Sequence, residues 1–347
     1  MRNKIYINGA EQISVQKPLC EEWIDNPIVY DVQYARSIDP NFRDFLSPIE
    51  ARRMGKILKR ALATSLTIIS KTGIEKPDAI ITGTGLGCIE NTELFLDALC
   101  NEGEQLLKPT YFMQSTHNTI SSLLAIHTKS HGYNVTYAHK GISFESALYD
   151  AYLQIKLEKI NNALVGSHDE MTPSYFRLLE KIGYVGGEMN GLCGEASVSI
   201  ILSNKKDNST LCELAALRML YKPSSKKFKE TIDRALNEAE LNYSDIDAIM
   251  TGVNGLDIND KVYDEYLNAT PFKTQLLKYK HIFGECYSAS AFSVYATSHC
   301  LNRGIIPNYF IYKNEKSIST PKAMLLINHS DAKSFSIIIL KSVSDND

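Results

Sequence analysis

The sequence lacks any apolar run of the roughly 18 residues that a helix needs to span a bilayer. Its opening residues, MRNKIYINGAEQIS, predict a strand rather than a secretory signal peptide. We therefore expect a soluble, cytoplasmic protein that has no membrane partner.

Cysteine pairs at metal-binding spacing are also missing, because none of the seven cysteines belongs to a Cys-x-x-Cys motif. This spacing indicates neither a zinc ribbon nor a disulfide framework, and we expect no metal and no other cofactor. Most of the cysteines are predicted to be reduced core residues, and the seven are Cys20, Cys88, Cys100, Cys193, Cys212, Cys286 and Cys300.

A basic excess is absent as well, since the formal net charge is -3. Nucleic-acid-binding proteins usually carry such an excess, so no nucleic-acid partner is expected. What is present is a chain of 347 residues, 44% of them hydrophobic, which can bury a large core as two domains or one fused double domain.

One short segment occurs twice in nearly the same form. Asp78–Gly83 reads DAIITG, and Asp247–Gly252 in the second half reads DAIMTG. Each is predicted to be a buried strand that runs into a glycine turn. A helical pattern precedes each copy and contains Arg60-Ala-Leu62 in the first and Arg234-Ala-Leu236 in the second. The repeated order indicates a duplicated domain.

Each half also ends on a similar strand. Ser197–Leu202 (SVSIIL) and Phe335–Leu340 (FSIIIL) are apolar, β-branched runs of the kind found in central strands covered on both faces. A polar run follows the first of them, so we divide the chain into an N-terminal half, 1–207, and a C-terminal half, 208–347.

A helix is predicted to begin at Ser47-Pro48, because serine is a good N-cap and proline suits the first turn. Apolar residues then recur on one face as far as Leu66. Basic residues are expected on the opposite face, and they are Arg52, Arg53, Lys56, Lys59 and Arg60.

Other elements alternate between strand and helix. A short strand is predicted over 4–7, and further strands over 133–138 and 163–168, with a long helix over 141–158 between the last two. Such an alternation is typical of a layered α/β fold.

Four landmarks, in this order, resemble the β-ketoacyl carrier-protein synthases of the thiolase fold. They are Glu50–Met54, a basic helix start; Gly83–Gly87, a glycine turn; Asn118; and Gly194–Ala196, a strand entry. The resemblance covers the whole chain. It implies two halves that each hold a five-stranded sheet and stack as an α-β-α-β-α sandwich.

The same resemblance places the catalytic cysteine of active members on the elbow Thr136–Gly141, at Ala138. Active members need a thiol there to carry the acyl chain as a thioester. Alanine has no nucleophilic atom. The adjacent His139 and Lys140 could be a substitute pair, but as sequence neighbours they should point apart.

Both family histidines are replaced too. Asn254 stands at the first position, with two residues missing shortly after it, and Glu285 stands at the second, while Lys280 of the family pattern is kept. A carboxylate would repel the negative charge that a neutral imidazole stabilises. The family's glycine-rich gating loop is also absent, since 328–333 reads NHSDAK. The resemblance therefore implies no catalytic residues.

A ketosynthase without its triad is similar to the chain-length factors, inactive paralogues that pair with an active sister and shape the tunnel for the growing chain. This implies a heterodimer with an active ketosynthase, or a homodimer, with 108–135 buried between the subunits. Candidates for the tunnel or the interface are Tyr111, Phe112, Met113 and Asn118. The alternative is that these are ordinary core residues.

An acyl carrier protein is the other implied partner. Carrier proteins are acidic, and the family docks them on cationic residues equivalent to Arg52 and Arg53, next to which Lys56 lies. The same pattern is also typical of a solvated helix face. A second basic group consists of Arg218, Lys222, Lys226 and Lys227.

Three other functions are open. An active acyltransferase could use Cys286 as a relocated nucleophile with His281 nearby in sequence. A nucleotide site could lie at Gly83–Gly87, although Cys88 replaces the third glycine of that motif. A metal centre could be built from His281, Cys286, His299 and Cys300.

Overall fold

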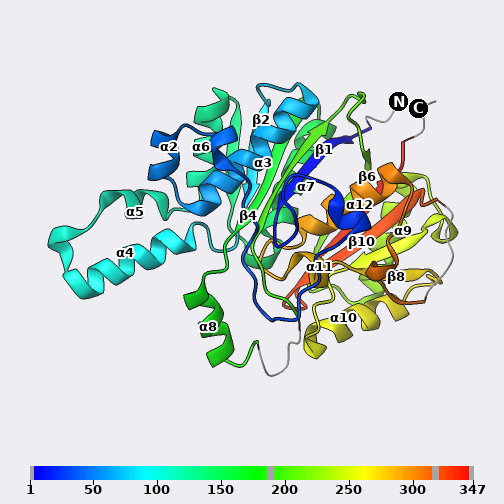
Figure 1. Ribbon diagram of the computed structural model, residues 1–347. Coiled ribbons are helices and arrows are strands. Elements are labelled where there is room, and N and C mark those ends of the chain that lie inside the picture. The colour runs from blue at the N-terminus through cyan, green and yellow to red at the C-terminus, as the bar shows by residue number, and fades with distance from the viewer. Residues whose placement is uncertain (1–3, 186–190, 315–319, 344–347) are drawn as a thin grey trace.

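The computed structural model describes residues 4–185, 191–314 and 320–343 (Figure 1). One continuous 11-stranded sheet forms the centre of the protein, and its two halves, called here the N-terminal and the C-terminal sheet, have the same topology. The N-terminal sheet has the strand order β3-β2-β4-β5-β1, and the C-terminal sheet has the order β8-β7-β10-β11-β6 with β9 added beyond β8. The strands are β1 (Tyr6–Ile13), β2 (Ala79–Gly83), β3 (Tyr133–Tyr137), β4 (Asn162–Asp169), β5 (Ala196–Ser203), β6 (Cys212–Tyr221), β7 (Ala248–Thr251), β8 (Gln275–Lys278), β9 (Ile311–Lys313), β10 (Ala323–Ser330) and β11 (Ser334–Lys341).

Helices connect and cover these strands. The α-helices are α1 (Glu22–Asp25), α2 (Pro48–Arg53), α3 (Lys56–Thr72), α4 (Ile89–Glu102), α5 (Pro109–Gln114), α6 (Thr119–Thr128), α7 (Ser143–Lys156), α8 (Pro173–Lys181), α9 (Ser225–Ala239), α10 (Asp257–Asn268), α11 (Lys280–Phe283) and α12 (Ala291–Arg303). Short 3-10 turns are η1 (Phe42–Asp44), η2 (Glu104–Leu106), η3 (Lys140–Ile142), η4 (Tyr243–Asp245) and η5 (Asn308–Phe310).

Pairing within the two sheets is identical. β2 pairs in parallel with β3 and β4, as β7 does with β8 and β10, and the remaining pairs of each five-stranded set are antiparallel. The repeated DAI-x-TG segments form β2 and β7, which occupy equivalent positions. The first strands of the two halves meet through the pairs Tyr6↔Glu213 and Ile7↔Cys212. The predicted duplication is therefore confirmed.

Five layers follow from the helix contacts. α3 and α6 cover the outer face of the N-terminal sheet, α9 and α10 cover that of the C-terminal sheet, and α7 and α12 lie between the sheets (Figure 1). The middle helices contact strands of both halves. The predicted α-β-α-β-α sandwich is confirmed.

α12 shows how strongly the middle layer is buried, because every residue from Ala291 to Leu301 is buried. Small residues allow this helix to pass between two sheets. Among the helices that the structure describes, none is long and apolar enough to cross a membrane.

The helix predicted to run from Pro48 through Leu66 is wrong as a single element. The chain leaves helical geometry at Met54 (φ -104°, ψ 137°), so α2 ends at Arg53 and α3 begins at Lys56. Gly55 forms the N-cap of α3 and lies close to the Asn91 side chain, where a larger residue would be crowded. Arg52 and Arg53 therefore belong to a different helix from the apolar face.

The first strand is longer than predicted. β1 extends to Ile13 although 8–12 reads NGAEQ, because pairing with β5 along its length satisfies the backbone. Gly9 lies against Ile68 of α3, where any side chain would collide. Packing rather than local pattern therefore decides this strand. The division at 207/208 falls in the connection between β5 and β6 and stays a prediction.

Candidate functional site

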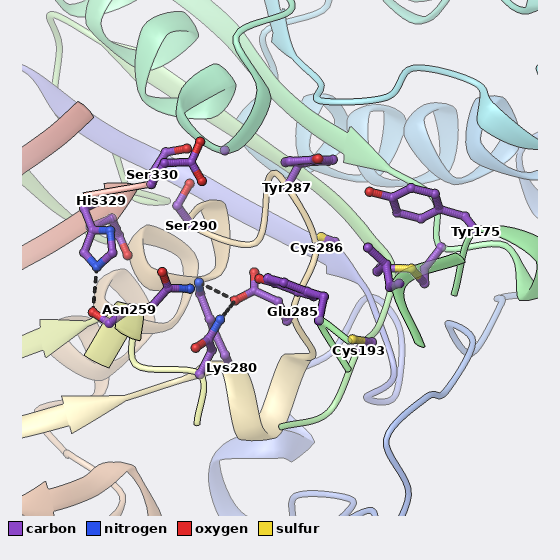
Figure 2. Close-up of a pocket in the computed structure, with 18 of the residues that line it drawn as sticks. Tyr175, Cys193, Asn259, Lys280, Glu285, Cys286, Tyr287, Ser290, His329 and Ser330 are labelled. Carbon is purple, nitrogen blue, oxygen red and sulfur yellow. Dashed lines mark hydrogen bonds and ion pairs between the residues drawn. The ribbon is translucent and has the colours of Figure 1, made fainter. Parts of the chain in front are cut away.

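A cavity of about 230 Å³ opens between the two halves. The C-terminal half supplies the loop after β7, the turn from α11 to α12 and the turn from β10 to β11, and the N-terminal half supplies α8 and the segment before β5 (Figure 2). Because these loops follow the carboxyl ends of β7, β8 and β10, the cavity lies where α/β sheets commonly place their sites.

Three of the predicted positions meet in this cavity. Lys280 Nζ lies 2.7 Å from Glu285 Oε2, and Asn254 Nδ2 donates to the same oxygen at 2.7 Å (Figure 2). Asp260 holds the loop by accepting from the backbone N–H groups of Asn254 and Gly255, each at 3.0 Å. The cavity thus contains a carboxylate bound by one ammonium and one amide.

The backbone around Glu285 is fixed from both sides. Glu285 N donates to Leu192 O (2.7 Å), and Gly194 N donates to Glu285 O (3.0 Å). Gly284 precedes it with φ 88°, a conformation that favours glycine, and its Cα packs against Gly194. The segment before β5, predicted as a family landmark, therefore positions Glu285.

Ala138 does not belong to this constellation. It is exposed between β3 and η3, and the elbow reaches the cavity only through Gly141. His139 is also exposed, and its Nδ1 lies 3.0 Å from Ser146 Oγ on α7. Lys140 is exposed with φ 52°. Neither neighbour points a reactive group into the cavity.

Cys286 lines the cavity, but its surroundings disfavour the thiolate. Burial, followed by the nearby carboxylates of Asp169 and Glu285, raises the pKa of Cys286 well above its ordinary value. His281 does not assist it, because His281 Nε2 bonds to Tyr309 O (2.9 Å) and its ring packs against Phe310. The Cys–His pair that a relocated nucleophile requires is not formed.

His329 is a cavity residue that the sequence analysis did not identify. Its Nε2 bonds to Asn259 O (2.9 Å) and its Nδ1 accepts from Ala332 N (3.3 Å). Burial lowers the pKa of His329 to about 4, so the ring is neutral and both nitrogens are engaged. It replaces neither family histidine.

Glu145 was missed as well, since a glutamate in a helix usually predicts a solvated position. It is fully buried on α7, where Ser290 Oγ (2.9 Å) and Ser336 Oγ (3.2 Å) donate to its two oxygens. Burial raises the pKa of Glu145 to about 7, against the opposing effect of Lys280. Only the folded structure brings this carboxyl beneath the cavity.

The glycine turn after β2 has no room for a nucleotide phosphate. The Asp169 carboxylate accepts from Gly85 N (2.9 Å), Leu86 N (3.0 Å) and Thr84 Oγ1 (2.9 Å), so the chain itself satisfies these donors. A side chain at Gly85 would collide with Tyr287. Gly83 and Gly87 are packed against Ser143 and His117 of the same half, so only Gly85 reflects the contact with the C-terminal half.

The predicted basic face needs one correction. Arg52 and Arg53 are exposed, and Lys56 is partly buried. Arg60, however, is only 1% exposed, because its guanidinium pairs with Asp39 (2.5 Å) and with the fully buried Glu195 (3.0 Å). The tertiary ion pairs outweigh the helical pattern that placed Arg60 in solvent.

The second basic group is also divided. Arg218 and Lys156 both pair with Glu238, whereas Lys222, Lys226 and Lys227 are exposed.

Among the residues that the structure describes, no group of three or more histidines, cysteines or carboxylates could hold a metal. His299, one proposed ligand, instead lies 3.3 Å from Glu21.

Phe112 and Met113 lie on an arm formed by α4 and α5, Ile89–Gln114, which projects from the N-terminal half (Figure 1). They are 59% and 70% exposed, so the alternative that they are core residues is wrong. Asn118, at the N-cap of α6, is exposed too. None of the three lines the cavity.

Comparison with known proteins shows the family. The profile of the beta-ketoacyl synthase N-terminal domain matches residues 21–245, well over half of the chain. The chain therefore belongs to the beta-ketoacyl synthase family, and the predicted family is confirmed. No functionally curated protein matches the sequence.

Solved structures show the same fold at low identity. The ishigamide ketosynthase/chain length factor is 17% identical with a TM-score of 0.79, covering 99% of this chain and 100% of that one. The ketosynthase ApeO in complex with its chain length factor ApeC, from Xenorhabdus doucetiae, is 14% identical with a TM-score of 0.79 and 98% coverage of both chains. The complex of AntDE with AntF, a type II polyketide acyl-carrier protein with its ketosynthase, is 14% identical with a TM-score of 0.77, covering 99% and 100%. The predicted thiolase-like fold is confirmed.

Proposed function

We propose that this protein is a non-catalytic, chain-length-factor-like subunit of a heterodimeric ketosynthase that makes a fatty acid, polyene or polyketide product. The observation that carries the proposal is the Glu285 carboxylate, bound by both Lys280 and Asn254 where active members hold an imidazole. A negative charge at that point opposes an enolate intermediate.

The elbow supports the same conclusion. Ala138 has no group that could form a thioester, and the cavity thiol of Cys286 is held in its protonated form. Without an acyl-enzyme, condensation must take place in another subunit.

The open side of the N-terminal half supports a partner subunit. Among the strands that the structure describes, β3 pairs only with β2 and is an edge strand, and such edges are templates for pairing with another chain. Large apolar side chains on the arm, α6 and β3 are exposed in the single chain, and they are Leu94, Leu96, Phe112, Met113, Ile126 and Tyr133. Exposed large apolar side chains on a projecting arm and an edge strand are typical of an interaction site. We therefore assign these residues, which we call the apolar edge surface, to a sister ketosynthase.

A carrier protein is the second proposed partner, with exposed Arg52 and Arg53 of α2 and the adjacent Lys56 as docking candidates. The related structures include a ketosynthase with its chain length factor and an acyl-carrier protein with its ketosynthase, which supports both kinds of partner. Within this proposal we keep the predicted cytoplasmic location.

The test is to co-express this chain with a ketosynthase that retains the Cys-His-His triad and to analyse the complex by intact mass after incubation with acyl- and malonyl-carrier protein. We expect a 1:1 complex in which only the sister subunit gains acyl mass. A stoichiometric acyl adduct on Cys286 would instead identify a relocated nucleophile and overturn the proposal.

A further inference from the structure

Lys280 is the only lysine or arginine among the described residues that line the cavity. Its charge is already matched, because Glu285 lies 2.7 Å from Nζ. The pair is mostly shielded from water, with side-chain exposures of 14% and 12%. An incoming anion would therefore have to compete with a carboxylate that the backbone holds in place.

Several carboxyl groups lie around the described part of the cavity, and one of them, Glu145, has a pKa of about 7 and is only partly ionised near neutral pH. Asp331 lies in the lining at the turn from β10 to β11. Asp260 lies directly behind Asn254, and Glu145 lies behind the lining residue Ser290. His329 adds no positive charge, because burial lowers its pKa to about 4. One cation thus faces several carboxyl groups.

The other walls are neutral. Tyr175 and Tyr184 approach from α8 and the segment after it, and burial raises the pKa of both phenols. Met171, Leu179 and Ile182 supply aliphatic surface. A volume of about 230 Å³ equals roughly seven or eight water molecules at about 30 Å³ each, which accommodates a short acyl unit.

We propose that the cavity is a charge filter, which admits an uncharged acyl group and rejects one that ends in a carboxylate, and that Glu285 is the residue that determines this specificity. The inference rests on the proposed function for the choice of acyl thioesters as ligands. Lys280 retains N–H donors that Glu285 does not use and can offer one to a neutral carbonyl oxygen.

The physical reason is the cost of placing like charges together away from water. A malonyl carboxylate in the cavity would lose part of its hydration and face the largely buried Glu285 carboxylate. The exposed Asp331 adds a weaker repulsion that solvent screens. A neutral acyl group avoids that repulsion. In a heterodimer, such a filter would leave malonyl extender units to the catalytic subunit.

Two ligands isolate the charge. Malonyl-pantetheine and acetoacetyl-pantetheine have nearly the same shape and differ in whether the chain ends in a carboxylate or a methyl ketone. Titration calorimetry of the purified protein should show acetoacetyl-pantetheine binding at least about 10-fold more tightly than malonyl-pantetheine. Glu285→Gln should raise malonyl affinity about 10-fold and change acetoacetyl affinity by less than about 3-fold.

Asp331→Asn provides a second variant, because this exposed turn residue can change without disturbing the fold. It should raise malonyl affinity by about 2-fold to 3-fold, in the same direction. Glu230→Gln on α9 makes the same charge change on the opposite side of the C-terminal sheet and should leave both affinities unchanged.

Equal binding of the two ligands to the unaltered protein, or an unaltered preference in Glu285→Gln, would overturn the filter. Failure of both ligands to bind at millimolar concentration would remove the cavity as an acyl site. In either case the proposed heterodimer is judged separately, by the 1:1 complex and the masses of its subunits.

Discussion

The two halves share one topology but treat their outer edges differently. In the C-terminal half, β9 pairs with β8 and covers the edge of the sheet. In the N-terminal half, the equivalent strand β3 is the last described strand of the sheet, and the arm projects from the same half (Figure 1). The duplicated fold thus ends on the five-residue strand β3 in one half and on the three-residue strand β9 in the other.

The two halves also differ in their buried ion pairs. The N-terminal half buries an ion-pair cluster around Arg60 and Glu195, whereas the C-terminal half places its Lys280–Glu285 pair in a cavity. The first cluster holds helices to a sheet and the second faces a ligand-sized space. Equivalent folds can therefore carry unlike polar sites, because side chains rather than strand order determine them.

The largest expected effect comes from breaking the buried pair in the N-terminal half. Arg60→Ala leaves the partly buried Asp39 without the guanidinium of Arg60 and leaves the buried Glu195 with the more distant Arg36 (3.5 Å), which should cost about 3–5 kcal/mol of unfolding free energy. Arg234→Ala, at the repeated position on α9, removes an exposed side chain and should cost less than about 0.5 kcal/mol. Urea denaturation of both variants measures the difference, and equal losses would contradict the asymmetry.

The contact between the halves can be tested through pH. Glu145 on α7 bonds to Ser290 and Ser336 of the C-terminal half, and its pKa of about 7 when folded exceeds the ordinary 4.5. The folded state therefore binds the proton more tightly, so its contribution to stability is complete below about pH 4.5 and is lost as pH rises to about 7. Because a pKa unit is worth about 1.4 kcal/mol, the loss is at most about 3 kcal/mol.

Glu145→Gln should remove that part of the pH dependence, measured by urea denaturation between pH 4.5 and 7.5. The matched variant is Glu170→Gln, because burial also raises the pKa of Glu170 to about 7 within the N-terminal half. Glu170 accepts from Ile57 N and Glu90 N, so its loss should also speed amide exchange in α4. Faster exchange in α4 of Glu145→Gln would show that the two carboxyls do not act separately.

The proposed association through the apolar edge surface can be disrupted without unfolding the chain. Phe112→Asp together with Met113→Asp changes two exposed residues of the apolar edge surface, so thermal stability should change little. Association with the sister subunit should weaken about 30-fold, corresponding to about 2 kcal/mol for an interface hot spot. The control is Ile258→Asp, because Ile258 is 70% exposed on α10 of the C-terminal half. If both changes weaken association equally, the proposed surface is wrong.

The smallest expected effect concerns carrier docking. Arg52→Ala with Arg53→Ala removes two exposed charges and should weaken carrier-protein binding about 3-fold to 10-fold, mainly through slower association at low salt. Lys226→Ala with Lys227→Ala removes two exposed charges from the C-terminal half and should have little effect. Surface plasmon resonance at two salt concentrations measures the carrier-protein affinity of both double variants. A larger loss of affinity in Lys226→Ala with Lys227→Ala would place the docking site on α9 instead.

Elements that depend on local sequence pattern could be predicted, and elements that depend on contacts between distant residues could not. The two DAI-x-TG strands and the closing strands were predictable, because a buried central strand must be apolar along its whole length. The break between α2 and α3 was not, since apolar residues on both sides continue one helical period. At the break, Gly55 lies close to the side chain of Asn91 and donates its N–H to Gln114 Oε1, and both partners come from distant parts of the chain.

The sequence by itself determined the duplicated order of strands and helices and the family. It also predicted that Ala138, Asn254, Lys280 and Glu285 stand at the family's catalytic positions, which stays a prediction. Tertiary structure alone decided that Asn254 and Lys280 share one oxygen of Glu285, that Ala138 lies apart from them and that Arg60 is buried. The physical reason is that periodicity reports which face of an element is apolar. Partners of a charged side chain come from segments far apart in the chain, and only packing brings them within hydrogen-bond distance.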